Sequence, residues 1–226
     1  MPIVTALDSD LQGKGTHCSH CLRHIQKGMA IPPGSDPLGS VYCSKDCQVK
    51  SKIQSQNLLF GLESPLPAEI APPASNADRN KAQVAFVDYL KRVKKSFPLL
   101  VARFIARQVA VETSKMMPHP GLLTAELPEV DGGDYTLYDH SERLRYLEMN
   151  ASEEEMKLLR QVLHTALPGL EQFVTDERHA MLLGKMAYNS YGVCFSGGRD
   201  DKVSRHAAVV CPGFLTILTA PSCGTP

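Results

Sequence analysis

The sequence lacks the features that place a chain in a membrane or draw it onto a charged polymer. No run of about 18 consecutive apolar residues occurs, which excludes a transmembrane helix. The 24 Lys and Arg residues balance 24 Asp and Glu residues, so no net charge attracts the chain to nucleic acid or to an anionic membrane. With 43% apolar and 21% charged residues among 226, collagen-like and disordered chains are excluded, and we expect one or two globular domains.

We expect no secretory leader. The first residues, MPIVTALDSD, contain no charged flank followed by an apolar stretch, so we expect a protein of the nucleus or the cytoplasm. In such reducing compartments, cysteines act as thiols or metal ligands before they form disulfides. The seven cysteines are therefore candidate metal ligands.

Four of the cysteines form two close pairs within about 30 residues. Two residues separate Cys18 from Cys21, and three separate Cys43 from Cys47. A tight turn directs both sulfurs of such a pair to one ion, and two pairs supply the four thiolates of a closed structural zinc site. We therefore expect one structural Zn²⁺ on these four residues. The alternative is four free buried cysteines, which suits this segment poorly because it has almost no apolar stripe and needs an ion to fold.

The other candidate ligands are not assigned to metal. Four sulfurs fill a tetrahedral shell, so we expect the neighbouring histidines to lie beside the site or on the surface. The three remaining cysteines are scattered along the chain and have no partner at a ligand spacing. The residues left without a metal role are His17, His20, His24, Cys194, Cys211 and Cys223.

The run THCSHCL…VYCSKDCQVK resembles the MYND zinc finger, above all as it occurs in SET–MYND protein-lysine methyltransferases. The most specific part is Tyr42-Cys43-Ser44-Lys45-Asp46-Cys47. The family finger has eight ligands that hold two zinc ions in a cross-brace. Residues 22–42 contain no second ligand pair, and residues 48–61 contain no fourth. The resemblance therefore implies a reduced finger with one zinc, in which Ile31–Gly39 replaces the second knuckle.

Two further elements resemble parts of the same family that bind S-adenosylmethionine. Leu147-Glu148-Met149-Asn150 is similar to a Leu-Glu-x-Asn element that reaches the cofactor, and Asn189-Ser190-Tyr191 is similar to an Asn-Ser-aromatic element that lines its pocket. The resemblance implies that Glu148, Asn150 and Asn189 contact S-adenosylmethionine. From the residues alone, Glu148 and Asn150 can equally begin a helix, and Asn189 can cap the end of one.

The sequence also departs from the family pattern. The family's Gly-rich cofactor turn precedes the finger, whereas Gly13-Lys14-Gly15 lies directly against it. Neither an Asn-His-Ser-Cys run nor a residue in the catalytic Tyr role follows Lys202. We therefore assign no catalytic residue and expect this chain to be a weak or inactive protein (histone) lysine methyltransferase. The alternative is a non-enzymatic zinc-finger interaction module that binds Pro-rich partners.

The local patterns predict a mainly α chain with a small zinc finger. The resemblance implies that this chain is a fragment of a split SET–MYND fold (α+β) that lacks most SET strands. Apolar spacing predicts a helix over 78–95, and a second from Ser96 to about Lys115. The capping pair Ser152 and Glu155 predicts a third helix that ends before Pro168, and Thr175 or Asp176 begins a fourth. The expected parts are an N-terminal remnant (1–16), a MYND-like finger (17–60), a Pro-rich linker (61–77), a helical SET-associated segment (78–202) and an atypical tail (203–226).

The expected partner is a protein substrate or a Pro-rich peptide rather than nucleic acid. Residues 81–115 carry eight Lys or Arg and two acids, while 126–155 carry ten acids and two Arg. We expect these opposite balances to offset each other in one fold or to be solvated. Residues 14–52 contain no Arg-rich helix, so direct nucleic-acid binding is not expected.

Overall fold

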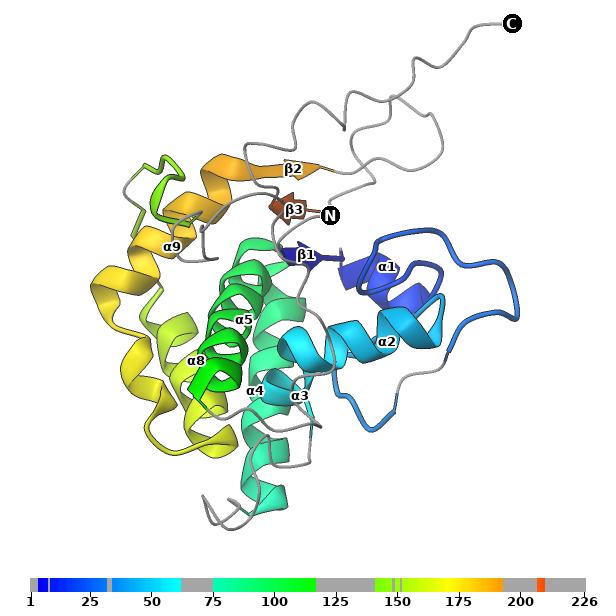
Figure 1. Cartoon of the computed structure of the whole chain (residues 1–226), viewed down its shortest axis with the longest axis horizontal. Helices are drawn as coiled ribbons and strands as arrows, with labels where there is room; N and C mark the ends of the chain where they lie inside the picture. Colours follow the sequence, from blue (N-terminus) through cyan, green and yellow to red (C-terminus); the bar gives the residue numbers. More distant parts are fainter. Residues whose placement is uncertain are drawn as a thin grey trace, which may run out of the picture.

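The computed structural model describes residues 4–7, 9–31, 34–61, 75–116, 141–147, 149–150, 152–192 and 207–209. Helices dominate these residues, and the described part of the segment predicted as a finger, 17–60, lies to one side of them (Figure 1). The mainly α prediction is therefore confirmed. The elements are β1 (Val4–Ala6), α1 (Ser9–Lys14), α2 (Lys45–Ser51), π-helix η1 (Lys52–Gln56), α3 (Asn57–Leu59), α4 (Asn76–Val93), α5 (Phe97–Met116), α8 (Glu153–Ala166), 3₁₀ helix η2 (Leu170–Phe173), α9 (Asp176–Asn189), β2 (Ser190–Gly192) and β3 (Ala207–Val209).

The four long helices begin and end close to the predicted positions because their caps are local. Helix α4 starts at Asn76, where the Ser75 side chain accepts a hydrogen bond from the amide of Ala77. It therefore takes the last two residues of the predicted linker. The Ser152 side chain accepts from the amide of Glu155, as the capping pair predicted, and Thr175 caps α9 in the same way.

The main core lies where α4 packs on α8 and α5 packs on α9. Helix α5 runs through the middle of the bundle, and all of its side chains from Leu99 to Arg107 are buried. Burial of so many large apolar side chains supplies most of the favourable free energy of folding. The fully buried large residues include Phe60, Phe86, Phe104, Leu100, Leu159, Leu163, Leu182 and Met186.

The segment predicted as one finger, 17–60, divides between two cores. Cys18, Ile25, Val41 and Tyr42 form a small separate cluster. The last residues, 58–60, instead pack into the main helical core. The finger thus has a small apolar interior that the sequence did not reveal, and its C-terminal helices anchor it to α5.

The N-terminal residues contribute to the core. Strand β1 lies against α5, and Val4 and Ala6 belong to the main apolar cluster. Part of the segment expected as an N-terminal remnant (1–16) is therefore buried in the main core, where a strand too short to show an apolar period in the sequence packs on α5.

A three-stranded antiparallel sheet closes one end of the bundle (Figure 1). The order is β1-β3-β2, so β3 from the predicted atypical tail is the central strand. Val209 is paired with both Val4 and Ser190. These three tail residues therefore join two segments that lie far apart in the sequence. Among the described helices, none is long and apolar enough to cross a membrane.

Candidate metal centre

The structure brings the four predicted cysteines together. The four sulfur atoms all lie within 4.8 Å of one another; they belong to Cys18, Cys21, Cys43 and Cys47. The Cys43 sulfur is 3.6 Å from that of Cys21 and 3.6 Å from that of Cys47. Sulfurs at these separations surround a point that one tetrahedral ion can occupy, so the four residues can hold one metal ion.

A tight turn supplies the first pair. The amide of Leu22 donates to the carbonyl of Cys18 at 2.9 Å, and Leu22 has a left-handed φ of 63°. The amide of Cys18 donates in turn to the carbonyl of Arg23, which closes the loop. This turn directs both sulfurs to the same side, as the two-residue spacing predicts.

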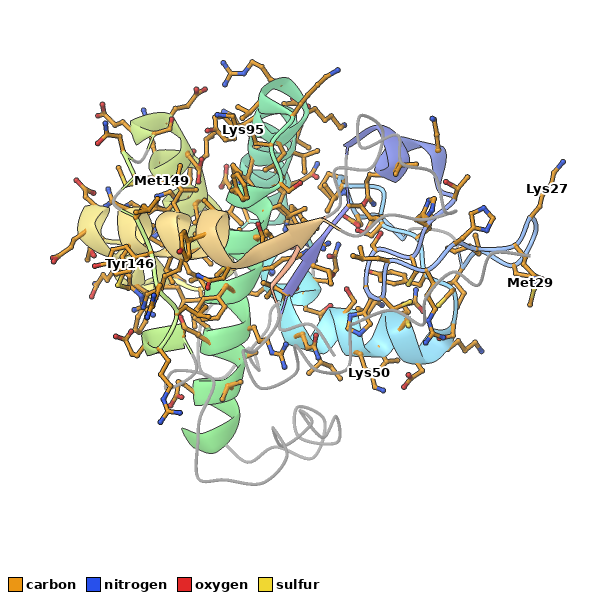
Figure 2. All side chains as sticks on the ribbon, turned by 90° about the horizontal axis from the view of Figure 1, so that it is seen from above. Lys27, Met29, Lys50, Lys95, Tyr146 and Met149 are labelled. Atoms are coloured by element: carbon orange, nitrogen blue, oxygen red, sulfur yellow. The ribbon has the colours of Figure 1, made fainter. Side chains whose placement is uncertain are left out.

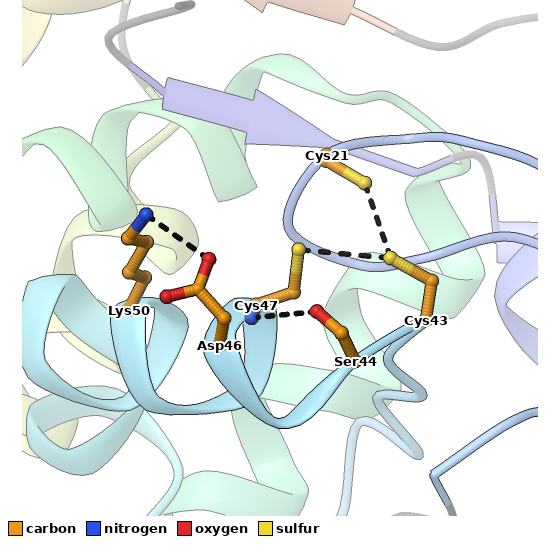
Figure 3. A network of polar contacts seen from close by, with 6 residues as sticks. All are labelled: Cys21, Cys43, Ser44, Asp46, Cys47 and Lys50. Carbon is orange, nitrogen blue, oxygen red and sulfur yellow. Dashed lines mark hydrogen bonds and ion pairs between the residues drawn. The ribbon is translucent and has the colours of Figure 1, made fainter.

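A helix start supplies the second pair. Ser44 is the N-cap of α2, and its hydroxyl accepts a hydrogen bond from the amide of Cys47 at 3.2 Å (Figure 3). Cys47 therefore lies in the first turn of α2, while Cys43 lies just before the cap. An ion pair of 3.0 Å between Lys50 and Asp46 lies on the exposed side of this helix.

Backbone hydrogen bonds fix the two pairs relative to each other. The amide of Ser19 donates to the carbonyl of Val41 at 2.8 Å, and the amide of Val41 donates to the Ser19 hydroxyl. Ile31 and Tyr42 exchange both of their backbone hydrogen bonds. The four sulfur atoms of the site are thus carried by backbone segments that are hydrogen-bonded to each other.

The segment expected to replace the second knuckle is organised by a carboxylate. Asp36 accepts hydrogen bonds from the amides of Leu38 and Ser40 and from the side chain of Gln56, at 2.7–3.0 Å. Charge-assisted bonds of this kind are stronger than neutral ones. Asp36 therefore fixes this loop against the end of η1 without a second ligand pair.

The neighbouring histidines have other contacts. His17 Nδ1 lies 2.9 Å from the Thr16 hydroxyl, and its ring packs edge-on against His24. His20 lies against Arg103 and Arg107 of α5. Within the described residues, the group with ligand geometry contains the four cysteines and no histidine.

The four thiols differ in acidity. A hydrogen bond from Cys21 lowers the pKa of Cys18 to about 4, against the opposing effect of burial. The same bond raises the pKa of Cys21, and burial adds to that rise. Burial raises the pKa of Cys47 to about 11. Without metal, Cys18 is therefore ionised at neutral pH, while Cys21 and Cys47 keep their protons.

Metal affinity is expected to increase with pH for this reason. A metal ion must displace the protons of Cys21 and Cys47, whose pKa values are raised, whereas Cys18 is already ionised above its pKa of about 4. The protons of Cys21 and Cys47 alone contribute a rise in apparent affinity of up to about a hundredfold per pH unit between pH 6 and 8. Competition with a chromophoric chelator measures this slope, and a pH-independent affinity would contradict it.

Of the three predicted cofactor residues, the structure describes two. Glu148 lies outside the described residues, and Asn150 is exposed. Asn189 donates its side-chain amide to the carbonyls of Arg145 at 2.7 Å and Lys185 at 2.8 Å. Figure 2 shows Tyr146 and Met149 at the opposite end of the molecule from Lys27 and Met29 of the finger.

The segment just before and at the start of the Leu-Glu-x-Asn element packs against α9, the helix that ends at Asn189. The Asn189 side chain donates a hydrogen bond to the backbone carbonyl of Arg145. Gly184 of α9 faces the carbonyl of Leu147 so closely that a Cβ at position 184 would overlap that oxygen. Glycine at this position therefore permits the contact between α9 and the segment that carries the Leu-Glu-x-Asn element.

Gly184→Ala is expected to lower the free energy of unfolding by about 1–3 kcal/mol, because the overlap outweighs the better helix propensity of alanine. Gly13→Ala in α1 is the control, since a Cβ there meets no atom within 4 Å. Urea unfolding of both variants measures the difference. Equal stability of the two variants would show that the 147 segment moves freely away from α9.

One residue of consequence could not be predicted from the pattern. Arg103 is buried in α5 and donates to the carbonyls of Thr5 at 2.6 Å and Ser19 at 3.3 Å, which joins β1, the finger and the bundle. In the sequence it is one of eight Lys and Arg residues between 81 and 115. Only the packing of α5 distinguishes it from exposed cations such as Lys91 and Lys95.

Comparisons with protein families, with curated proteins and with solved structures found no match for this chain.

Proposed function

We propose that Cys18, Cys21, Cys43 and Cys47 bind one structural zinc ion. The observation that carries this proposal is the convergence of four sulfurs within 4.8 Å. Soft thiolate donors in a tetrahedral set favour zinc over calcium or magnesium. Four protein ligands leave no open position for water or substrate, which suits a structural rather than a catalytic ion.

Elemental analysis of the purified chain, combined with thiol counting, tests this proposal. We expect one zinc per chain and four fewer reactive thiols than in the denatured, chelator-treated protein. A result of two zinc ions per chain would require ligands outside these four cysteines. A result of no zinc would contradict the proposed zinc site.

We further propose that this chain is a SET–MYND-type protein whose finger acts as a non-enzymatic interaction module. The support for the interaction role is the surface of the finger, where Met29 is 63% exposed and Val49 is 50% exposed. Figure 2 shows Met29 beside Lys27, projecting at the outer end of the finger. Exposed apolar side chains on a rigid support suit a proline-rich peptide, which loses little conformational entropy on binding.

Fluorescence anisotropy with a library of labelled Pro-rich peptides tests this role. The buffer is reducing, as in the nucleus or cytoplasm, and contains zinc. Met29→Ser and Val49→Ser are expected to weaken binding of any selected peptide. Val84→Ser on α4, which is 39% exposed and outside the finger, is the matched control. Equal affinity of all three variants would assign the peptide to another surface.

A methyltransferase-related function is the second candidate, and the packing of residues 145–147 against α9, which ends at Asn189, favours it. Residues 145–147 and Asn189 are about 40 positions apart in the sequence yet meet at one end of α9. The Asn189 side-chain nitrogen already donates to two backbone carbonyls, so its side-chain oxygen is the group that can accept from an amino-acid or ribose group. In this proposal, the chain carries part of a site for S-adenosylmethionine and methylates lysine weakly or not at all.

Calorimetry with S-adenosylmethionine and a methylation assay on a histone mixture separate these proposals. Saturable heat that Asn189→Ala abolishes would support the cofactor site. Turnover on histones would overturn the proposal of a non-enzymatic module. Absence of both would leave the interaction role.

A further inference from the structure

A polar notch lies at the junction of β1, the finger, α2, η1 and α5. Its volume is about 20 Å³, and the side chains and backbone around it come from five separate segments. A cavity needs about 10–15 Å³ to hold one water-sized atom, so this notch accepts the end of a small ligand and no more. The lining residues are Val4, Thr5, Ser19, His20, Ser51, Gln54, Ser55, Arg103 and Arg107.

Arg103 is the charged group at the base of the notch. Its side chain is 4% exposed, and its Nη1 atom donates to the carbonyls of Thr5 and Ser19. The Nε and Nη2 atoms are buried and have no hydrogen-bond partner among the described residues. Nε2 of His20, which lines the same notch, also lacks one.

Among the residues that the structure describes, no acidic side chain lines the notch to balance this charge. Asp36 and Cys18 act on Arg103 electrostatically, but burial has the larger effect and lowers the pKa of Arg103. Asp36 already accepts hydrogen bonds from two amides and from Gln56. A buried guanidinium without a hydrogen-bonded anion is costly, so a negative ligand at this position would stabilise the fold.

The chemistry of the unused donors identifies the class of anion. Nε and Nη2 form the side-on edge of the guanidinium, whose two parallel N–H bonds match two oxygens of one oxyanion. Arg107 brings a second positive charge to the notch, and the hydroxyls of Ser51 and Ser55 add further polar groups. Chloride is a single spherical acceptor, so both N–H bonds must converge on one atom and the match to the fork is poorer than for two oxygens.

We propose that this notch is a binding site for an inorganic oxyanion, phosphate or sulfate, held by Nε and Nη2 of Arg103 with Arg107 at its side. The oxygen end of the anion enters the notch, and the rest of it lies at the mouth near Gln54. The bound anion joins β1, the finger and α5, because residues of all three line the site.

Phosphate and sulfate titrations of the full, zinc-loaded chain test the site, with sodium chloride used to keep the ionic strength constant. We expect a saturable increase of the melting temperature and a saturable shift of the Arg103 ¹⁵Nε NMR signal. Arg107→Gln is expected to weaken phosphate binding at least tenfold, because hydrogen bonds and charge contacts to an anion are lost. Lys91→Gln, an exposed cation on α4, is the matched control and should bind as the parent chain does.

Arg103→Lys keeps the charge but removes the fork, so it should abolish the shift and identify the NMR signal. If that variant does not fold, Arg107→Gln and Ser55→Ala still test the site in a folded chain. A melting temperature that rises equally in chloride, or an Arg103 signal that phosphate does not move, would overturn the proposal. Either result would mean that Asp36 and the thiolate cluster alone balance Arg103.

Discussion

Replacement of Cys43 by serine is expected to reduce the bound metal from one ion per chain to none. The Cys43 sulfur lies 3.6 Å from two of the other three sulfurs, so its loss opens the centre of the site. Binding of structural zinc to small fingers supplies about 10–16 kcal/mol of apparent free energy at neutral pH, which is also free energy of folding. Four apolar residues in the finger's own cluster cannot replace that contribution.

The measurement is zinc content together with the proton NMR spectrum of the finger. We expect the dispersed amide signals of residues 17–47 to collapse in Cys43→Ser, while the helical circular dichroism of the bundle largely remains. Cys211→Ser makes the same chemical change outside the cluster and should keep one zinc. A Cys43→Ser chain that retains stoichiometric zinc and a folded finger would contradict the four-sulfur site.

Replacement of His179 by alanine is expected to lower the free energy of unfolding by about 3–5 kcal/mol. The imidazole is completely buried, and its Nε2 lies 2.9 Å from Oε1 of Glu155, whose other carboxylate oxygen accepts from the hydroxyl of Tyr89 at 3.1 Å. This contact joins α9, α8 and α4 through one carboxylate. Its removal leaves both a cavity and a buried carboxyl group without one of its partners.

The chain contains a matched control at the surface. His164 lies 3.0 Å from Glu171, but the two side chains are 57% and 30% exposed. Solvent-exposed pairs contribute about 0–1 kcal/mol, so His164→Ala should change stability by less than 1 kcal/mol. Urea unfolding compares the two variants. Equal losses would show that burial of the His179–Glu155 contact has no effect on its contribution.

A double replacement separates the contact from the packing. Tyr89→Phe removes one hydrogen bond to Glu155 and should cost about 1–2 kcal/mol on its own. Combined with His179→Ala, the loss is expected to differ from the sum of the two, because both residues contact the same carboxylate. Additive losses would assign the effect of His179 to packing alone.

The helical part of the fold could be predicted from the sequence because its signals are local. Ser152 caps α8 through a residue three positions away, and Thr175 caps α9 in the same manner. The left-handed turn at Gly169 after α8 follows from the Pro168-Gly169 pair. Each of these features depends on neighbours within one turn of the chain.

The sheet and the buried polar contacts could not be predicted in this way. Strand β3 has three residues, and it becomes the centre of a sheet only because β1 and β2 meet it from distant positions. Asn189 was a candidate cofactor ligand, and the structure shows its amide on two backbone carbonyls. Such partners are set by the meeting of segments, and no residue spacing encodes them.

The sequence by itself determined which four atoms can form the metal centre, because the spacing within each cysteine pair restricts both sulfurs to one side of a short turn. Only the tertiary structure decided that the two turns converge, that Arg103 is buried beside them with two unused donors, and that His179 meets Glu155. The reason is physical: a turn is fixed by dihedral angles over a few residues, whereas burial and charge pairing depend on which helices exclude water together.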